Sequence, residues 1–526
     1  MNRSPVRPVL SLVALALLSH CGGGNGGPSA SSGSSSPVST QVSGASPLAT
    51  NCGTAVPTGT SETYTSGSAV QPQLAAIPGG SLVGVWEQDR WSGLGARAIL
   101  TANSADGGAT WGAPIVLPFS KCGPGAGPGA QYDRTSDPWV TYAGSGVVLA
   151  SALAFSANGY TAGGFASTGG LSAVLVSRST DGGVTWSTPV QVFQDTNPGP
   201  TLFFNDRDSI AFDPFGNAYL VWDRLTNGID SVSGSPNSMP AWIAISPDGG
   251  VTWPTTGANA PHVLYDPGVG NQAFSNQIVV LPNGRVLDFF TLVALTTSTT
   301  PTVLQVVSSG DHGATWSAPV SVANITSVGT PDPIAAGPAI RDSPFIAQIA
   351  VDPASGNLAA VWQQSFNAGT FDGVALSVST NGGAAWSTSL RQINGVKTAA
   401  AFSPTVRYLP GGVLAVTYYD LRDYAAGSAT LSTSAWLTES SDGGATWKEL
   451  RLQSPFDLNK APLTNNNRQF GISPALFLGD NQGLALVGTG ALPMYAATNS
   501  AGAHAYATRA PNPLTSPSAH SYPAGP

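Results

Sequence analysis

An eight-residue pattern, Ser-x-Asp-x-Gly-x-Thr-Trp, occurs six times in this 526-residue chain, with small departures in one copy. Neighbouring copies are spaced 61 to 75 residues apart. The copies are Ser104–Trp111, Ser179–Trp186, Ser246–Trp253, Ser309–Trp316, Ser379–Trp386 and Ser440–Trp447. Self-similarity at a nearly fixed period indicates an array of like structural units.

Each octet lies between two strand-like runs, which predicts a hairpin turn. The short acidic side chain can accept hydrogen bonds from backbone N–H groups two or three residues further on. The glycines supply positive φ without a Cβ penalty, and the Trp anchors the returning strand by burying apolar surface. We therefore predict structural roles for Asp106, Asp181, Asp248, Asp311, Asn381 and Asp442. The octet lacks the further oxygen ligands of a calcium loop, and we expect no metal and no cofactor.

The octet resembles the Asp-box, or BNR repeat, of the sialidase-like β-propellers. In that family it marks the hairpin between the third and fourth strands of a blade, away from the active face. The resemblance covers roughly residues 68–450. It implies an all-β fold, an Asp-box β-propeller, and leaves the activity open because propellers host many functions.

A second marker, a turn between two apolar runs, repeats out of phase with the octets. These turns lie at residues 78–80, 143–146, 214–217, 282–284, 353–357, 410–412 and 479–483. We interpret them as the hairpins between strands one and two. Seven turns and six octets predict seven four-stranded blades, the last with a degraded octet near 499–502. Residues near 54–66 would add the strand that closes the ring. Six blades plus a terminal appendage is the alternative.

The N-terminus has the form of an export signal. Arg3 and Arg7 precede an apolar run, Val9–Leu18, that is too short to span a bilayer as a helix. The residues up to Cys21 resemble a bacterial lipobox. The resemblance implies cleavage of residues 1–20 and lipidation of Cys21, with an anchor in the cell envelope at the outer membrane or cell surface. An ordinary secretory signal is the alternative.

Composition divides the rest of the chain. Residues 21–50 are rich in Gly and Ser and predict a flexible tether, 51–510 predict a single propeller domain, and 511–526 predict a disordered tail. Cys52 and Cys122 are the other cysteines, and in an oxidising compartment we expect them to form a disulfide. The formal net charge of −8 disfavours nucleic-acid binding. We expect a monomer.

In four-stranded up-and-down blades the one–two and three–four hairpins share one face, so function is expected on the opposite face. First-strand starts and second-strand ends bring charge there, and Arg suits bidentate recognition of carboxylate or phosphate. The candidate ligand-binding residues are Arg134, Asp206, Arg207, Asp223, Arg224, Arg341, Asp342 and Arg422. The alternative is that each pair is a structural ion pair between blades.

Catalysis is not assigned by the sequence. Sialidases use an arginine triad, a Tyr nucleophile with a Glu, and an Asp, and their first Arg lies in an Arg-Ile-Pro motif. Here Ala76 precedes Ile77-Pro78, so that Arg is absent. The catalytic candidates are Tyr418, Tyr419, Asp208 and Glu87. Three hypotheses follow: a propeller that binds glycan or another anionic ligand, a divergent exo-acting glycoside hydrolase of sialidase type, and a protein–protein scaffold.

Overall fold

The computed structural model describes residues 36–57, 60–125, 127–159, 169–197, 202–226, 238–294, 302–334, 337–366, 369–465 and 474–525. They belong to one compact unit, Ser35–Pro526. The predicted signal peptide and the lipidation site Cys21 lie outside the described residues. Within those residues, no helix has the length and apolar character needed to cross a membrane.

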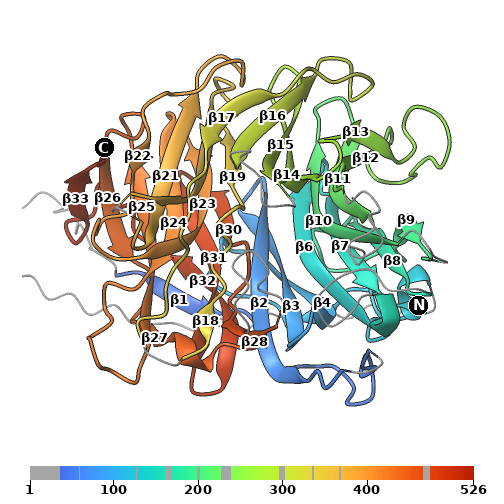
Figure 1. Ribbon diagram of the computed structural model, residues 1–526, viewed down its shortest axis with the longest axis horizontal. Helices are drawn as coiled ribbons and strands as arrows, with labels where there is room; N and C mark the ends of the chain where they lie inside the picture. The colour runs from blue at the N-terminus through green and yellow to red at the C-terminus, as the bar shows by residue number, and fades with distance from the viewer. Residues whose placement is uncertain are drawn as a thin grey trace, which may run out of the picture. The chain divides into compact units, whose positions relative to one another are not determined.

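Nearly all of the regular structure is antiparallel β-sheet (Figure 1). The first three four-stranded groups are β2 (Tyr64–Ile77), β3 (Ser81–Trp91), β4 (Ala96–Ser104) and β5 (Ile115–Val116); β6 (Arg134–Tyr142), β7 (Val148–Phe155), β8 (Ser172–Ser179) and β9 (Val190–Asp195); and β10 (Phe203–Phe212), β11 (Ala218–Thr226), β12 (Ala241–Ser246) and β13 (His262–Tyr265).

The next three groups follow the same up-and-down order. They are β14 (Asn271–Val280), β15 (Val286–Ala294), β16 (Val303–Ser309) and β17 (Val320–Asn324); β19 (Gln348–Val351), β20 (Leu358–Ser365), β21 (Asp372–Ser379) and β22 (Arg391–Gln392); and β23 (Ala401–Leu409), β24 (Val413–Asp420), β25 (Ser432–Ser440) and β26 (Thr446–Arg451). The last group is β30 (Gly483–Val487), β31 (Gly490–Asn499), β32 (Gly502–Arg509) and β1 (Val38–Gln41).

The remaining elements are short strands and 3₁₀ turns outside the four-stranded groups. They are the strands β18 (Ala339–Ile340), β27 (Phe456–Asp457), β28 (Leu463–Thr464), β29 (Ala475–Leu476) and β33 (His520–Pro523), and the 3₁₀ turns Pro128–Gln131, Ala157–Gly159 and Leu458–Lys460.

The first strands of successive groups contact one another in the order β2, β6, β10, β14, β19, β23 and β30, and β30 contacts β2 again. Neighbouring sheets pack face to face through apolar side chains. For example, Leu149 of β7 shares a buried cluster with Leu220 and Trp222 of β11. Four-stranded sheets that pack face to face, with their first strands innermost, define a β-propeller fold. Each packed layer of this fold is a β-sheet.

The octets occupy the hairpins between third and fourth strands. In the second copy the Ser179 hydroxyl donates to Asp181 at 2.8 Å, and the Gly183 N–H donates to Ser179 at 2.8 Å. Asp181 also accepts from the N–H of Thr185, four residues on, at 2.9 Å and from its hydroxyl at 2.6 Å. The Trp burial that we predicted differs among copies, because Trp253 and Trp447 are buried whereas the other four are only half-buried.

The second glycine of each octet packs against the preceding group. A Cβ on Gly183 would lie 2.6 Å from Val83 of β3, and one on Gly250 would lie 2.6 Å from Leu149 of β7. Gly108, in the first octet, meets Leu492 of the last group in the same way, at 2.6 Å. The octets are therefore contacts between groups as well as turns, and the first of them joins the two ends of the array.

The fourth strand of the last group is not the one that we predicted. Val38–Gln41 (β1) pairs with Tyr506–Arg509 of β32, and blue β1 lies beside red β32 in Figure 1. This strand lies inside the range predicted to be a flexible tether, whereas residues 54–57 and 60–63 are outside any strand. Its Val and Thr residues suit an edge strand, and the third strand β32 offers a free backbone edge that β1 covers.

Two turns of the last group were also predicted wrongly. Residues 479–483 lead into first strand β30 and do not join strands one and two, which meet instead between Val487 and Gly490. Residues 499–502 join β31 to β32, so they form a two–three turn and not a worn octet. The reason is that the third and fourth strands of this group come from opposite ends of the chain, which leaves no place for an octet.

The C-terminal segment is ordered to residue 525, contrary to the predicted tail. β33 pairs with β26 in antiparallel register, and Tyr522 lies opposite Trp447. The Tyr522 side chain is buried, and its hydroxyl donates to the carbonyl of Ile393 at 2.9 Å. One aromatic residue with a satisfied hydroxyl thus anchors a segment whose composition is otherwise typical of disorder.

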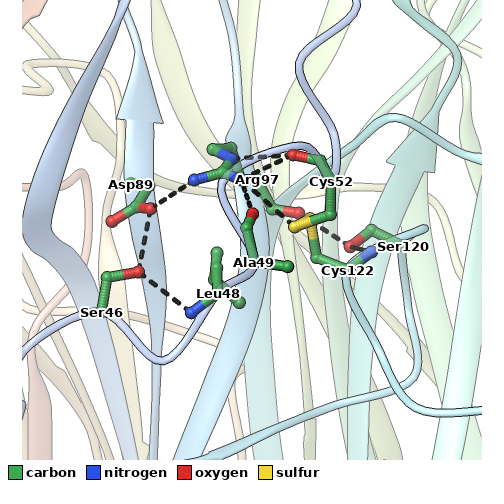
Figure 2. The surroundings of a disulfide bond; sticks show 8 residues. All are labelled: Ser46, Leu48, Ala49, Cys52, Asp89, Arg97, Ser120 and Cys122. Atoms are coloured by element: carbon green, nitrogen blue, oxygen red, sulfur yellow. Dashed lines mark hydrogen bonds and ion pairs between the residues drawn. A yellow bond between two sulfur atoms is a disulfide. The ribbon is translucent and has the colours of Figure 1, made fainter.

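The N-terminal segment is attached to the first group around a disulfide between Cys52 and Cys122 (Figure 2). The buried guanidinium of Arg97 donates from Nε to the Cys52 carbonyl at 2.9 Å and from Nη1 to Asp89 at 3.0 Å. The Ser46 hydroxyl donates to the same Asp89 carboxylate at 2.9 Å. A covalent bond and an ion pair together hold this segment against β3 and β4.

Candidate functional site in the mouth of the propeller

Each group carries a residue with positive φ within its first strand or a few residues before it. These residues are Gln71, Asp137, Arg207, Ser275, Ser343, Ser403 and Gly479, with φ from 47° to 119°. In five of the first strands the register with the second strand also shifts at this point, which marks a β-bulge. Bulges re-aim side chains. In each first strand the one–two hairpin follows the bulge, so the bulges lie on the side away from the hairpins and octets, toward the mouth of the propeller.

Three bulges are held by a side chain from the preceding group. Glu87 accepts from the N–H of Asp137 at 3.2 Å, and Asp223 accepts from the N–H of Ser275 at 2.7 Å. Gln363 accepts from the N–H of Ser403 at 3.1 Å. These acceptors are fully buried. Two predicted site residues, Glu87 and Asp223, therefore bind backbone between groups and do not face a ligand.

A cavity of about 390 Å³, which we call the mouth cavity, opens among the bulges. Its charged lining consists of Arg90, Asp137, Asp206, Arg207, Arg341 and Asp480, and its apolar lining includes Leu94, Phe204, Leu225, Met239, Phe274 and Phe477. A concave site with apolar walls and a few converging polar groups is the usual form of a ligand pocket.

Asp480 is the most heavily paired group of the cavity. Arg341 donates to it from Nε at 3.0 Å and from Nη2 at 2.9 Å, while Arg207 and the Ser343 hydroxyl also donate to its oxygens. Burial alone would raise the pKa of Asp480, but the two guanidinium groups outweigh burial and hold it well below the usual value. Asp480 thus stays ionised and locks both arginines in place.

Asp206 lies beside the ion-pair cluster of Asp480, Arg207 and Arg341 but takes no part in it. Its carboxylate has no hydrogen-bond or ion-pair partner within the described residues, and the side chain remains partly open to the cavity. Burial and the nearby Asp137 raise its pKa to about 6 against the opposing charges of Arg207 and Arg341. Arg207 Nε is likewise buried and unpaired, and its guanidinium carbon lies 5.2 Å from the centre of the Phe274 ring. A free acid, a guanidinium group and an aromatic ring therefore line one cavity.

Arg90 forms the other side of the cavity. Its Nε lies 3.2 Å from Glu87 Oε2, and its guanidinium carbon lies 4.7 Å from the centre of the Phe477 ring. Burial raises the pKa of Glu87 to about 7, with Arg90 opposing. Glu87 therefore exchanges its proton near neutral pH behind the cavity wall.

Of the residues predicted to bind ligand, the mouth cavity gathers Asp206, Arg207 and Arg341. The others lie elsewhere and have their own partners. Arg134 lies 2.6 Å from Glu62 and 3.9 Å from the Trp91 ring centre. Arg224 forms an ion pair with Asp195, and its guanidinium group lies over the Phe203 ring.

Two further predicted residues are buried away from the cavity lining. Asp342 accepts from Gln363 at 3.2 Å and from the N–H of Thr330. Asp208 is buried at the bottom of the mouth, where burial raises its pKa well above the usual value.

The structure separates the tyrosine candidates from this cavity. The Tyr418 hydroxyl donates to Glu449 at 2.6 Å, and Arg422 donates to the same carboxylate at 2.7 Å. This is the Tyr–carboxylate arrangement that a sialidase-type site requires, but the Tyr418 side chain is fully buried within its sheet and is not part of the mouth cavity. Tyr419 donates to the Ala496 carbonyl at 2.7 Å and joins two groups. Catalysis from these tyrosines is therefore not supported by their positions.

Asp480, Phe274 and Phe477 were missed. Asp480 was assigned to a turn on the octet face because Gly479–Gly483 looks like the other Gly-rich turns. A usable signal existed, since four bulge residues precede a proline, at Pro72, Pro138, Pro344 and Pro404. Within the described residues, no group of His, Cys, Asp or Glu could hold a metal ion.

No protein-family model matches the chain, and no curated protein matches it. Solved structures similar to it include a protein of unknown function from Dyadobacter fermentans, with 17% identity over 70% of this chain and 94% of that chain and a TM-score of 0.43. A Hadza microbial sialidase shares 16% identity over 85% of this chain and 66% of its own, with a TM-score of 0.42. An α-L-arabinanase from Penicillium chrysogenum shares 12% identity over 84% and 93%, with a TM-score of 0.43. The fold assignment here rests on strand order and the octet hairpins.

Proposed function

We propose that the mouth cavity binds a glycan. The observation that carries this proposal is the unpaired Asp206 carboxylate, which lies in a 390 Å³ cavity with the side chains of Arg207 and Phe274. Sugars present vicinal hydroxyls, which donate to carboxylates and accept from guanidinium groups, and apolar C–H faces, which pack on aromatic rings. A rigid lining of this kind suits them.

The charge balance of the cavity narrows the ligand class. Three arginines and three aspartates line it, and Arg207 and Arg341 already neutralise Asp480. A polyanion would find no net positive field here, so a neutral sugar or one with a single carboxylate is the ligand that this cavity fits.

A glycoside hydrolase is the second candidate. It is favoured by the pKa of about 6 at Asp206, because an acid that holds its proton in a ligand cavity is suited to general acid catalysis. The sialidase-type arrangement of a tyrosine beside an arginine triad does not support it, since Tyr418 and Arg90 lie in different parts of the fold.

We further propose that the propeller has seven blades and that it is anchored in the cell envelope. Seven blades, closed by β1 on β32, are supported by the returning contact of β30 with β2 and by the packing of the first octet on Leu492. Anchoring in the cell envelope through a lipidated Cys21 is supported by the sequence around that residue. A propeller displayed in this way would present its mouth to extracellular sugars.

The test is a glycan array that contains neutral, monocarboxylated and polysulfated oligosaccharides, together with release of a fluorogenic sialoside. Asp206→Asn keeps the shape of the side chain but loses the acceptor charge, and should weaken binding about tenfold. Asp181→Asn, which copies the natural Asn381 of another octet, is the matched control and should bind as wild type. Turnover lost in Asp206→Asn would establish the hydrolase, whereas no binding and no turnover would reject both functions and favour a scaffold.

A further inference from the structure

A second cavity, the lower cavity, lies at the octet end of the first strands. Its volume is about 500 Å³, and apolar side chains of successive first strands line it, among them Ile210, Ile278, Ile349, Val406 and Leu484. Pro214, Pro282 and Pro353, from the hairpins between strands one and two, also line it. Because those hairpins share a face with the octets, the lower cavity opens on the side away from the mouth.

A narrow neck separates the two cavities. It encloses only about 10 Å³ and shares Asp137 and Arg207 with the mouth, and Trp139, Gln277 and Gln348 with the lower cavity. Hydrogen-bonded side-chain amides line this neck. Gln277 accepts from the Ile349 N–H at 3.0 Å, and Gln348 donates to Asn481 at 3.0 Å. A space of this size holds about one water molecule. A ligand of the lower cavity must therefore be recognised by the lower cavity itself.

Arg407 of β23 is the charged side chain in this lining, which contains no carboxylate among the described residues. Within the part of the chain that the structure describes, its guanidinium has neither a hydrogen-bond nor an ion-pair partner. The side chain is exposed, although protein surrounds it, and burial lowers its pKa without an opposing acid. Both facts fit a guanidinium that projects into a solvent-filled cavity.

The position of Arg407 is unusual among the first strands. In the register of the sheets its equivalents are Thr141, Ala211, Val279 and Ala350, which also line the cavity. Arg407 lies opposite Ala415, which lies opposite Glu439 on the next strand. Burial raises the pKa of Glu439 to about 7 and both of its oxygens are unpaired, so this acid does not act as the counter-ion.

Arg407 thus places a cation without a counter-ion in an otherwise largely apolar lining, and such walls disfavour a strongly hydrated anion. We propose that the lower cavity binds an amphipathic monocarboxylate, with the carboxylate on Arg407 and the alkyl body along the aliphatic walls. Guanidinium pairs with carboxylate through two parallel hydrogen bonds, and 500 Å³ lies within the usual range for small-ligand cavities.

Isothermal titration with sodium octanoate tests this proposal. Wild-type protein should bind octanoate, and Arg407→Gln should bind it about tenfold or more weakly. Arg407→Lys, which keeps the charge, should retain measurable binding. Arg509→Gln removes an exposed arginine with no side-chain partner among the described residues, and as the matched control it should bind as wild type.

Octan-1-ol supplies the same alkyl body without the charge and should bind about tenfold more weakly than octanoate to wild type. Asp206→Asn, in the mouth, should leave octanoate binding unchanged, which separates this site from the proposed glycan site. Absence of octanoate binding, equal binding by Arg407→Gln, or equal binding of octan-1-ol would each overturn the proposal. Melting temperatures of the variants confirm that each is folded when titrated.

Discussion

The octet hairpins and the mouth bulges are the two sets of repeated turns in this propeller, and they are built in opposite ways. In an octet the local side chains make the turn, so Ser, Asp and Thr recur with nearly the same bonds in five of the six copies. In a bulge the backbone geometry recurs while the side chain changes from Gln to Asp, Arg, Ser or Gly. Neighbouring groups hold the bulge, as Glu87 holds Asp137.

The difference shows where variation is tolerated. An octet tolerates changes that keep its hydrogen-bond acceptor, as Asn381 does, and its carboxylates are already committed to Ser, Thr and backbone donors. A bulge held from outside leaves its own side chain free to acquire a function. The titration of the acids agrees with this division. Hydrogen bonds from Thr110 lower the pKa of Asp106 to about 2, whereas burial raises the pKa of Asp206 to about 6.

The largest expected effect is at the mouth. Asp480→Ala leaves two buried guanidinium groups without their shared carboxylate, and should lower the free energy of unfolding by about 3–5 kcal/mol. Urea denaturation monitored by tryptophan fluorescence measures this. Asp206→Ala, which removes an unpaired acid from the same cavity, should cost less than about 1 kcal/mol. Similar losses of unfolding free energy in the two variants would contradict the role of Asp480 as the shared counter-ion of Arg207 and Arg341.

The next effect is at an octet. Gly183→Ala forces an alanine to a φ of +88° and places its Cβ 2.6 Å from Val83, which should cost about 2–3 kcal/mol. Gly146, in a one–two turn on the same face, has a φ of +80° but no neighbour of its new Cβ nearer than 3.9 Å. Gly146→Ala should therefore cost only about 1 kcal/mol. Equal costs would show that the octet glycine serves the turn alone and not the contact between groups.

The pH dependence of stability separates the regions next. The folded-state pKa of Asp206, about 6, lies above its usual value of 3.8, so the folded protein keeps a proton that the unfolded chain releases. Stability from this group is present below pH 3.8 and is lost as pH rises through 6. We expect Asp206→Asn to remove about 2 kcal/mol of the fall in unfolding free energy between pH 4.5 and pH 7.5. Parallel stability curves for wild type and variant would refute the raised pKa.

The smallest effect is expected for Asp181→Asn. Asn381 shows that an amide oxygen can accept the same bonds, since it accepts from the Ala385 N–H at 2.9 Å and from Ser379 at 2.9 Å. The change should cost less than about 0.5 kcal/mol in urea denaturation, whereas Asp181→Ala should cost about 1 kcal/mol. An equally large loss for Asn and Ala would mean that charge, and not hydrogen bonding, holds the octet.

This contrast also explains what could be predicted from sequence. The all-β fold, the octet hairpins and six of the seven one–two turns were visible because local side chains determine them. The closing strand β1 was not, since its partner β32 lies at the other end of the chain.

The candidate site was predicted only in part. Asp206, Arg207 and Arg341 were found from charge at strand ends, but Asp480 follows a glycine that looks like a turn. Its role depends on arginines from two distant groups, Arg207 and Arg341, which no local pattern reveals. Burial could not be predicted either, so Asp223 and Glu87 were assigned to ligand binding and catalysis, although they bind backbone.

Hydrogen exchange with and without the tightest-binding glycan of the array tests the central claim most directly. The account predicts slower exchange in peptides that contain Asp206–Asp208 and Arg341–Phe345, and no change in peptides that contain the six octets. Slower exchange at the octets, with the mouth unchanged, would contradict the placement of function at the bulges.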